Sequence, residues 1–249
     1  MMPLRLTRSG IAGTLLALAV AAVCVRLGIW QLDRLEQRRE RNAAIEERLG
    51  RPPLALHDLP PDTTGLLFRV VTLEGDYDVA HSIVLRGRAL NGAPGVHVLT
   101  PLRLPGGAAV LVNRGWVPSP DAATIELATI PPPAAGALRG LALPYPADGE
   151  AVAEDGGFRR TWARLDLAAL RHQFPYALAA FYVQALPADT GDAATVPRPL
   201  APPELDDGPH LSYAVQWFAF ATIALVGWTT LALRRGSQST RRPPPDERR

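Results

Sequence analysis

Hydrophobic residues are concentrated near the two ends of the chain, whereas the middle alternates between short apolar runs and turn-forming residues. The first apolar run, IAGTLLALAVAAVCV, covers residues 11–25, and its extension to Trp30 brings it to twenty residues. The second, LSYAVQWFAFATIALVGWTTLAL, covers residues 211–233 without a charged side chain. About twenty helical residues span the ~30 Å hydrocarbon core of a bilayer. The pattern therefore predicts two transmembrane helices, at 11–30 and 211–233.

The first run admits two other interpretations. A signal peptide cleaved after the ALA of Ala17–Ala19 is one, and a lipoprotein modified at Cys24 is the other, although the bulky Val23 before the cysteine disfavours it. The helical pattern continues past either cleavage point, which favours a retained anchor. Arg26 then lies near the far end of the span, where its stem can snorkel, and Trp30 suits an interfacial anchor. For the second run, a buried core helix is the alternative, and the absence of charge disfavours it.

The region between the two runs predicts one helical extension followed by strands. Residues 31–49 are charged, contain no Pro and no Gly, and are expected to continue the first helix until Pro52 and Pro53 stop it. Asn91-Gly92 and Pro105-Gly106-Gly107 are turn signals between strand-like segments. Strand-like composition recurs at 68–77, 82–88, 96–104, 108–112, 137–143, 158–163 and 181–185.

The fold class that follows is an α+β membrane protein. Two helices are expected to flank an antiparallel, β-rich domain that resembles a partly closed barrel, with a short helix at 166–174. The Pro-rich and acidic stretch 187–207 is expected to connect this domain to the second helix.

The distribution of charge predicts the topology. All 26 basic residues are Arg; residues 1–10 carry two and no acid, residues 234–249 carry six with two acids, and the middle has 18 against 22 acids. Arg-rich flanks remain in the cytoplasm. The chain is therefore expected to comprise a cytoplasmic N-terminus (1–10), the first transmembrane helix (11–30), a periplasmic β-rich domain (31–210), the second transmembrane helix (211–233) and a cytoplasmic, disordered basic tail (234–249). A middle of this charge does not fit a nucleic-acid-binding surface.

Composition also excludes several kinds of site. Cys24 is the only cysteine and Met occurs only at positions 1 and 2, so an intramolecular disulfide, a multi-cysteine zinc site and a thiolate–thioether copper site are excluded. No C-x-x-C-H motif is present for covalent haem attachment. The sequence also lacks G-x-S-x-G, a glycine-rich phosphate loop and paired-histidine metal spacings, so nothing in it indicates an enzyme.

One set of residues at the predicted outer membrane surface fits ligand binding. His210, Tyr213 and Trp217 share a helical face at the start of the second span. His210 is either a polar flank or an axial ligand of a lipophilic haem, with Tyr213 and Trp217 as an aromatic wall. On the first span, Arg26 and Trp30 lie at i and i+4; Arg26 either pairs with a haem propionate or simply snorkels.

Five sequence blocks, in order, resemble the surfeit-locus-one family. They are RLGIWQLDRL at 26–35, FRVVTLEGDY at 68–77, GVHVLTPLRL and VLVNRGWVP within 95–118, FYVQ at 181–184 and HLSYAVQWFAF at 210–220. The resemblance covers nearly the whole chain.

This resemblance implies a non-enzymatic assembly factor for haem-copper terminal oxidases, chiefly cytochrome c oxidase, in the inner membrane of a bacterial cell. Bacterial members resemble haem a-binding proteins that act at oxidase subunit I, and the family's haem ligand, the His of H-x-x-Y-A-x-x-W, falls on His210. The implied cargo is haem a, and the implied partners are subunit I, other oxidase assembly factors and the lipid bilayer. A scaffold that docks subunit I without haem is the alternative.

The third block also contains Asn113, Arg114, Gly115 and Trp116, just beyond a predicted strand. They are interpreted either as a tight turn anchored by an interfacial Trp or as a surface that docks a partner.

Overall fold

The structure is a computed structural model that describes residues 8–57, 59–60, 62–133, 136–150, 157–187 and 196–239. The chain forms two compact units. One combines residues 1–44 with residues 205–249, and the other comprises residues 45–204.

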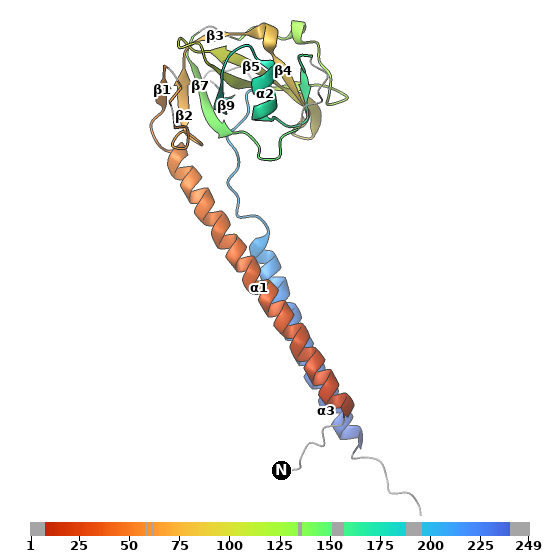
Figure 1. The fold of residues 1–249 in the computed structure, drawn as a ribbon. Coiled ribbons are helices and arrows are strands. Elements are labelled where there is room, and N and C mark those ends of the chain that lie inside the picture. Colours follow the sequence, from red (N-terminus) through yellow and green to blue (C-terminus); the bar gives the residue numbers. More distant parts are fainter. Residues whose placement is uncertain are drawn as a thin grey trace, which may run out of the picture. The chain divides into compact units, whose positions relative to one another are not determined.

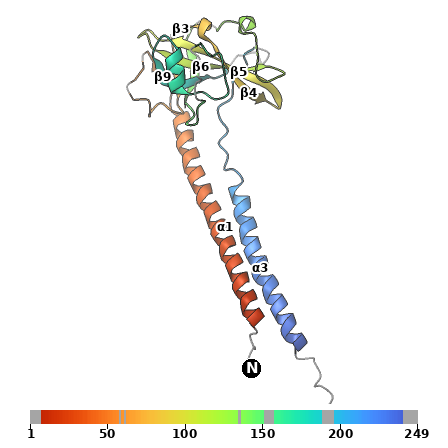
Figure 2. The ribbon, with the colours of Figure 1, turned by 45° about the vertical axis from the view of Figure 1, so that its right-hand side comes forward.

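The first unit is a pair of long helices, α1 (Arg8–Leu49) and α3 (His210–Ser239). They lie side by side and run in opposite directions (Figures 1 and 2). As predicted, α1 continues without a break past Trp30, and it ends just before Gly50 and the two prolines. α3 continues six residues beyond the predicted limit at 233. The predicted N-terminal segment up to residue 7, and the tail from residue 240, lie outside the described residues.

Small side chains line the contact between α1 and α3. Ala21, Cys24, Ala214 and Ala221 are each at most 7% exposed. A Cβ on Gly28 would lie 2.7 Å from the ring of Phe218. Small residues allow two helices to approach closely, which compensates in lipid for the missing hydrophobic driving force.

Large apolar side chains cover the outer surface of the pair. Leu15, Leu16 and Leu18 on α1, and Ile223 and Val226 on α3, are more than half exposed. Both helices are long and apolar enough, by length and composition, to cross a membrane. Exposed Leu, Ile and Val on a helix pair of that kind match a lipid environment, which agrees with the predicted spans.

The second unit is built on nine strands and a short helix. They are β1 (Leu54–Leu56), β2 (Val70–Leu73), β3 (Asp76–Tyr77), β4 (Ile83–Leu90), β5 (Ala93–Arg103), β6 (Ala109–Pro118), β7 (Leu138–Pro144), β8 (Thr161–Trp162), α2 (Leu167–Gln173) and β9 (Leu178–Ala185), with single 3-10 turns at Val79–His81 and Leu127–Thr129. The strand order is β1-β2-β7-β9-β6-β5-β4-β8, and β3 pairs with β5. The predicted α+β class, with helices at both ends of the chain and a short helix within the domain, is confirmed.

The sheet is mixed: the expected antiparallel pairing holds for most neighbouring strands, and three pairs are parallel. β1 pairs with β2, β4 with β8, and β6 with β9 in parallel, whereas the remaining pairs are antiparallel. Within the described residues, the strands at the two ends of the order, β1 and β8, are not paired with each other, and the order is open rather than closed into a barrel. Hairpin signals report only antiparallel neighbours, because parallel strands require a longer crossover connection.

The two turns that the sequence indicated join the central strands. Asn91 and Gly92 connect β4 to β5 with φ of 51° and 81°, which is the left-handed pair that a type I′ turn requires. Gly107, with φ of 86°, lies in the turn between β5 and β6.

The sheet has an apolar core on both faces. On β6, Val110 and Val112 belong to one core cluster and Ala109 and Leu111 to another, since successive strand residues point to opposite faces. α2 covers the second cluster (Figure 1) through its buried Leu170. The cap of α2 is Asp166, whose carboxylate accepts a hydrogen bond from the backbone N of Ala169 at 2.8 Å.

A glycine exchange tests the α1–α3 contact. A Cβ on Gly13 would overlap the ring of Trp228, whose Nε1 donates to Oγ1 of Thr14 at 3.0 Å. We expect Gly13→Ala to displace the indole and to destabilise the helix pair by about 1–3 kcal/mol. Thermal unfolding of the full chain in detergent, followed by near-UV circular dichroism, measures this effect.

The matched control is Gly227→Ala on α3. A Cβ at Gly227 meets nothing within 4 Å, so this variant should unfold at or slightly above the wild-type temperature. Equal stability of the two variants would contradict the described packing.

Candidate functional site

His210 is the first residue of α3, and its imidazole contacts α1. Gly208, with φ of 65°, turns the chain just before it, and the backbone N of Tyr213 donates to the carbonyl of Pro209 at 3.1 Å. The side chain of His210 is half-buried, and its Nδ1 lies 2.9 Å from Oε1 of Gln31. The imidazole of His210 is therefore hydrogen-bonded to the neighbouring helix.

Polar residues of α1 bind the segment just before His210, and we call this cluster the polar clamp: Arg38, Arg39, Asn42, Asp206 and Asp207. Arg38 donates to the carboxylate of Asp206 at 2.6 Å and to its backbone carbonyl at 2.8 Å, and Asn42 donates to the same carbonyl at 2.8 Å. Arg39 donates twice to Asp207. Exposed ion pairs are individually weak, about 0–1 kcal/mol, but these hydrogen bonds all converge on two consecutive residues and together fix the segment that leads into α3.

His210 and Arg38 both border Gly208. A Cβ on Gly208 would lie 3.6 Å from Nε2 of His210 and 3.7 Å from Nε of Arg38. A ligand bound at Nε2 would thus have a guanidinium nearby.

The other predicted residues on α3 are arranged as their spacing suggests. Trp217 lies on the same face as His210, and it is partly buried against Ala21, Cys24 and Ala221. Its ring also contacts Phe220 edge-to-face at a centroid distance of 5.8 Å. Tyr213 is 46% exposed and lies on the flank of this face.

The structure does not bring Arg26 and Trp30 to His210. Both are exposed, Trp30 to 47%. Cys24, Gly28 and Gln31 face α3, and at 100° per residue Arg26 and Trp30 lie on the opposite side of α1. Sequence reasoning missed Gln31 and Arg38. The 3-4 spacing of small residues before Gln31 is the signal that could have identified this face.

The segment from Asn113 to Trp116 lies inside β6, so the predicted tight turn is wrong. In the pairing with β5, Val98 is opposite Gly115 and Leu99 is opposite Asn113, which leaves Arg114 as the extra residue of a β-bulge. Gly115 has φ of 128°, and a Cβ there would overlap the carbonyl of Arg198. The turn-forming residues serve a bulge within the strand.

The side chains of Asn113 and Trp116 contact other residues of the β-rich unit rather than solvent. Oδ1 of Asn113 accepts from the backbone N of Gly115 at 3.1 Å, and Nδ2 of Asn113 lies 3.2 Å from Nδ1 of His97. Trp116 is 3% exposed. Arg114 alone is partly exposed, and it donates to the carbonyl of Pro131 at 2.5 Å. A partner that docked here would reach Arg114 and not the three buried residues.

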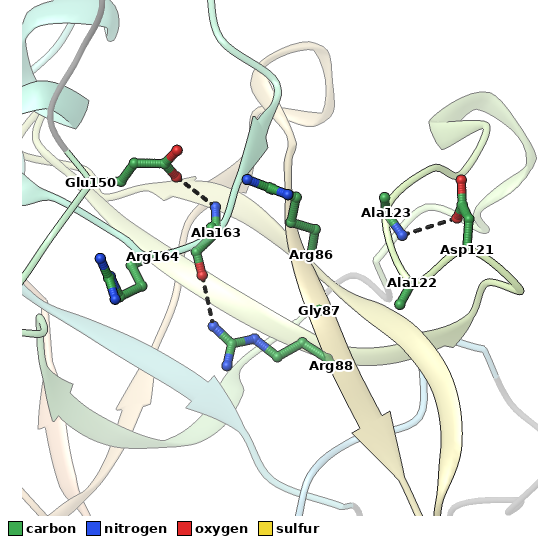
Figure 3. A pocket seen from close by; sticks show the side chains of 9 residues that line it. All are labelled: Arg86, Gly87, Arg88, Asp121, Ala122, Ala123, Glu150, Ala163 and Arg164. Carbon is green, nitrogen blue, oxygen red and sulfur yellow. Dashed lines mark hydrogen bonds between the residues drawn. The ribbon is translucent and has the colours of Figure 1, made fainter.

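Five charged side chains of the β-rich unit line a cavity of about 580 Å³ (Figure 3). Its lining residues are Arg86, Gly87, Arg88, Asp121, Ala122, Ala123, Glu150, Ala163 and Arg164. The hydroxyls of Ser119 and Thr124 donate to the carboxylate of Asp121 and, with the backbone N of Thr124 at 3.0 Å and of Ala123 at 2.9 Å, hold its pKa well below the usual range. Glu150 accepts from the backbone N of Ala163 at 2.7 Å. Both acids are thus used to fix loops.

Metal ligation by several protein groups has no support in the described part of the chain. It contains no group of three or more His, Cys, Asp or Glu side chains arranged around a metal ion. His81 has an oriented Nδ1, 2.8 Å from Asp78, but Phe158, Phe174 and Tyr176 pack around its ring. His210, in contrast to His81, lies at the contact between α1 and α3.

Comparison with known proteins gives consistent matches along the chain. The model of the SURF1 family matches residues 18–222, which include Gln31 and His210. A SURF1-like protein of Monosiga brevicollis is 27% identical over 248 residues, covering 93% of this chain and 92% of that protein. An uncharacterized SURF1-like protein of Mycobacterium tuberculosis is 28% identical over 250 residues, covering 95% and 90%. Surfeit locus protein 1 of Arabidopsis thaliana is 36% identical over 117 residues, covering 42% and 33%.

The burial of His97 predicts a loss of stability in mild acid. Burial, and secondarily the charge of Arg88, lowers the pKa of His97 to about 4 from 6.5. The neutral imidazole therefore stabilises the fold fully above about pH 6.5, and this contribution is lost as the pH falls from about 6.5 toward about 4. We expect the full chain to lose about 1–2 kcal/mol of unfolding free energy from this group between about pH 7.5 and pH 5.

Denaturant unfolding at the two pH values measures the effect. His97→Gln should reduce the difference between them. His172→Gln, at an exposed position on α2, should leave it as in the wild type. An unchanged difference in His97→Gln would show that other groups are responsible.

Proposed function

This chain belongs to the SURF1 family, and on that premise we propose that it binds haem a at His210 and promotes its insertion into subunit I of a cytochrome c oxidase. The family consists of non-enzymatic cytochrome oxidase assembly factors. In this proposal haem a is cargo, which the protein delivers to the oxidase together with other assembly factors.

The observation that supports haem binding is the position of His210 between two kinds of surface. On one side lies the polar clamp, with Arg38 bordering Gly208. On the other, α3 continues as an apolar helix from Leu211. Haem a has the same division, because its propionates are charged whereas its isoprenoid tail requires an apolar surrounding. An imidazole at this junction can supply one axial bond to the iron.

The proposed site consists of His210, Trp217 and Arg38, with Tyr213 at its edge. Trp217 would contact the macrocycle or its tail, and Arg38 would meet a propionate in exchange for Asp206. Arg26 and Trp30 face away from α3, which supports the alternative role of anchoring α1 at the membrane surface.

We further propose that both ends of the chain lie in the cytoplasm of a bacterial cell and that residues 31–210 lie in the periplasm. The Arg-rich flanks of the two candidate spans support this orientation. His210 and the polar clamp would then lie at the periplasmic surface of the inner membrane.

Removal of the imidazole tests the haem proposal. We expect wild-type protein purified from membranes of cells that make haem a to carry a Soret band, and His210→Ala to shift or weaken it. Apolar contacts at Trp217 remain, so retention should fall without vanishing. His172→Ala, at an exposed position on α2, is the control and should keep the wild-type spectrum.

An unchanged spectrum and haem content in His210→Ala would remove the ligand assignment. Absence of haem from the wild-type protein, with subunit I still captured, would favour the alternative of a scaffold without cargo.

The orientation is tested by fusion of a reporter that is active only in the cytoplasm. We expect activity for a fusion after Arg249 and none for a fusion at Pro187, because one span separates the two positions. An active fusion at Pro187 would contradict the proposed topology.

A further inference from the structure

The imidazole of His210 is held by one hydrogen bond from the neighbouring helix. Its Nδ1 lies 2.9 Å from Oε1 of Gln31, a residue 179 positions away in the chain. Both side chains are half-buried and both lie on the faces where α1 and α3 meet. In the described part of the chain, no hydrogen bond is made by Nε2 of His210.

This contact determines which ring nitrogen carries the proton. The carbonyl oxygen of an amide only accepts hydrogen bonds, so Nδ1 must donate to Oε1 of Gln31. In the neutral ring the lone pair then resides on Nε2, the nitrogen that borders Gly208. In metal proteins, a ligating histidine commonly donates its other N–H to a carbonyl or carboxylate, which fixes the ring and strengthens the ligand.

We propose that Gln31 is a positioning residue for His210: it fixes the tautomer and orientation of the imidazole so that Nε2 is presented to the iron of a haem. This inference rests on the proposed function. The same bond also joins α1 to α3, so the test must separate ligand control from simple packing.

Two substitutions at Gln31 make this separation. Gln31→Leu keeps a side chain of similar size but removes the acceptor, so both tautomers of His210 become accessible. Gln31→Glu keeps an acceptor in place and replaces an amide oxygen by a carboxylate oxygen, which makes the imidazole a stronger donor to iron. If Gln31 served packing alone, the reduction potential of bound haem would be the same in the wild type and in an equally stable Gln31→Glu variant.

The first measurement needs no haem. In full-length, histidine-labelled protein in micelles, the ¹⁵N spectrum should show His210 protonated at Nδ1, with the signal assigned by its loss in His210→Ala. Gln31→Leu should give a mixture of tautomers. Gln37→Leu is the matched control, because Gln37 lies on the same helix, exposed, and accepts only from Arg34 at 2.9 Å among the described residues. Protonation at Nε2 in the wild type would overturn the inference.

The second measurement uses protein purified with haem a. Gln31→Leu should lower haem retention about 10-fold and broaden the Soret band. Gln31→Glu should retain haem and lower its reduction potential, and Gln37→Glu should change neither. Wild-type values in both Gln31 variants, with haem still dependent on His210, would overturn the role of Gln31 alone. A wild-type protein without haem would overturn the proposed function and, with it, the role of Gln31 as a positioning residue.

Discussion

The candidate site depends on the close packing of α1 against α3, which small residues, chiefly Gly and Ala, make possible. It brings residues from opposite ends of the chain together, because His210 and Gln31 are separated by 179 positions. Larger side chains at Ala21, Ala214 or Ala221 would force the helices apart. A hydrogen bond of 2.9 Å is lost when its two atoms move apart only slightly. The bond between His210 and Gln31 therefore requires the close helix approach that the small residues allow.

Local features of the fold could be predicted from the sequence, whereas distant pairings could not. The turn at Asn91-Gly92 requires two left-handed residues, and few sequences provide them. Asp166 and the apolar spacing after it similarly define α2. The parallel pairing of β6 with β9, in contrast, joins segments about 60 residues apart. Nothing in either strand's own sequence encodes its neighbour, so the mixed sheet was beyond a prediction based on hairpin signals.

In the candidate site, too, positions set by one helix could be predicted, whereas contacts between the two helices could not. The spacing of His210 and Trp217 placed them on one helical face, which follows from helical geometry alone. Arg26 and Trp30 also share a face, but the face of α1 that meets α3 is decided by the partner helix. Gln31 was missed because a glutamine has no distinctive chemistry until its neighbour is known.

The block from Asn113 to Trp116 shows a further limit of sequence reasoning. Gly115 has φ of 128°, a backbone conformation that residues with a Cβ rarely adopt. Asn and Gly form both turns and β-bulges, and the choice between them depends on whether the strand continues. Here β6 continues to Pro118, so the block interpreted as either a tight turn or a docking surface forms a bulge within the strand.

Two hydrogen bonds at the ends of the helix contact fix the register of the pair. Thr14 and Gln31 on α1 are about 26 Å apart along the helix, and His210 and Trp228 on α3 are about 27 Å apart, so both bonds form in a single alignment. A slide of one turn, about 5.4 Å, would break both together. A separation of the helices at the His210 end alone would break only the bond to Gln31 and leave that between Trp228 and Thr14 in place.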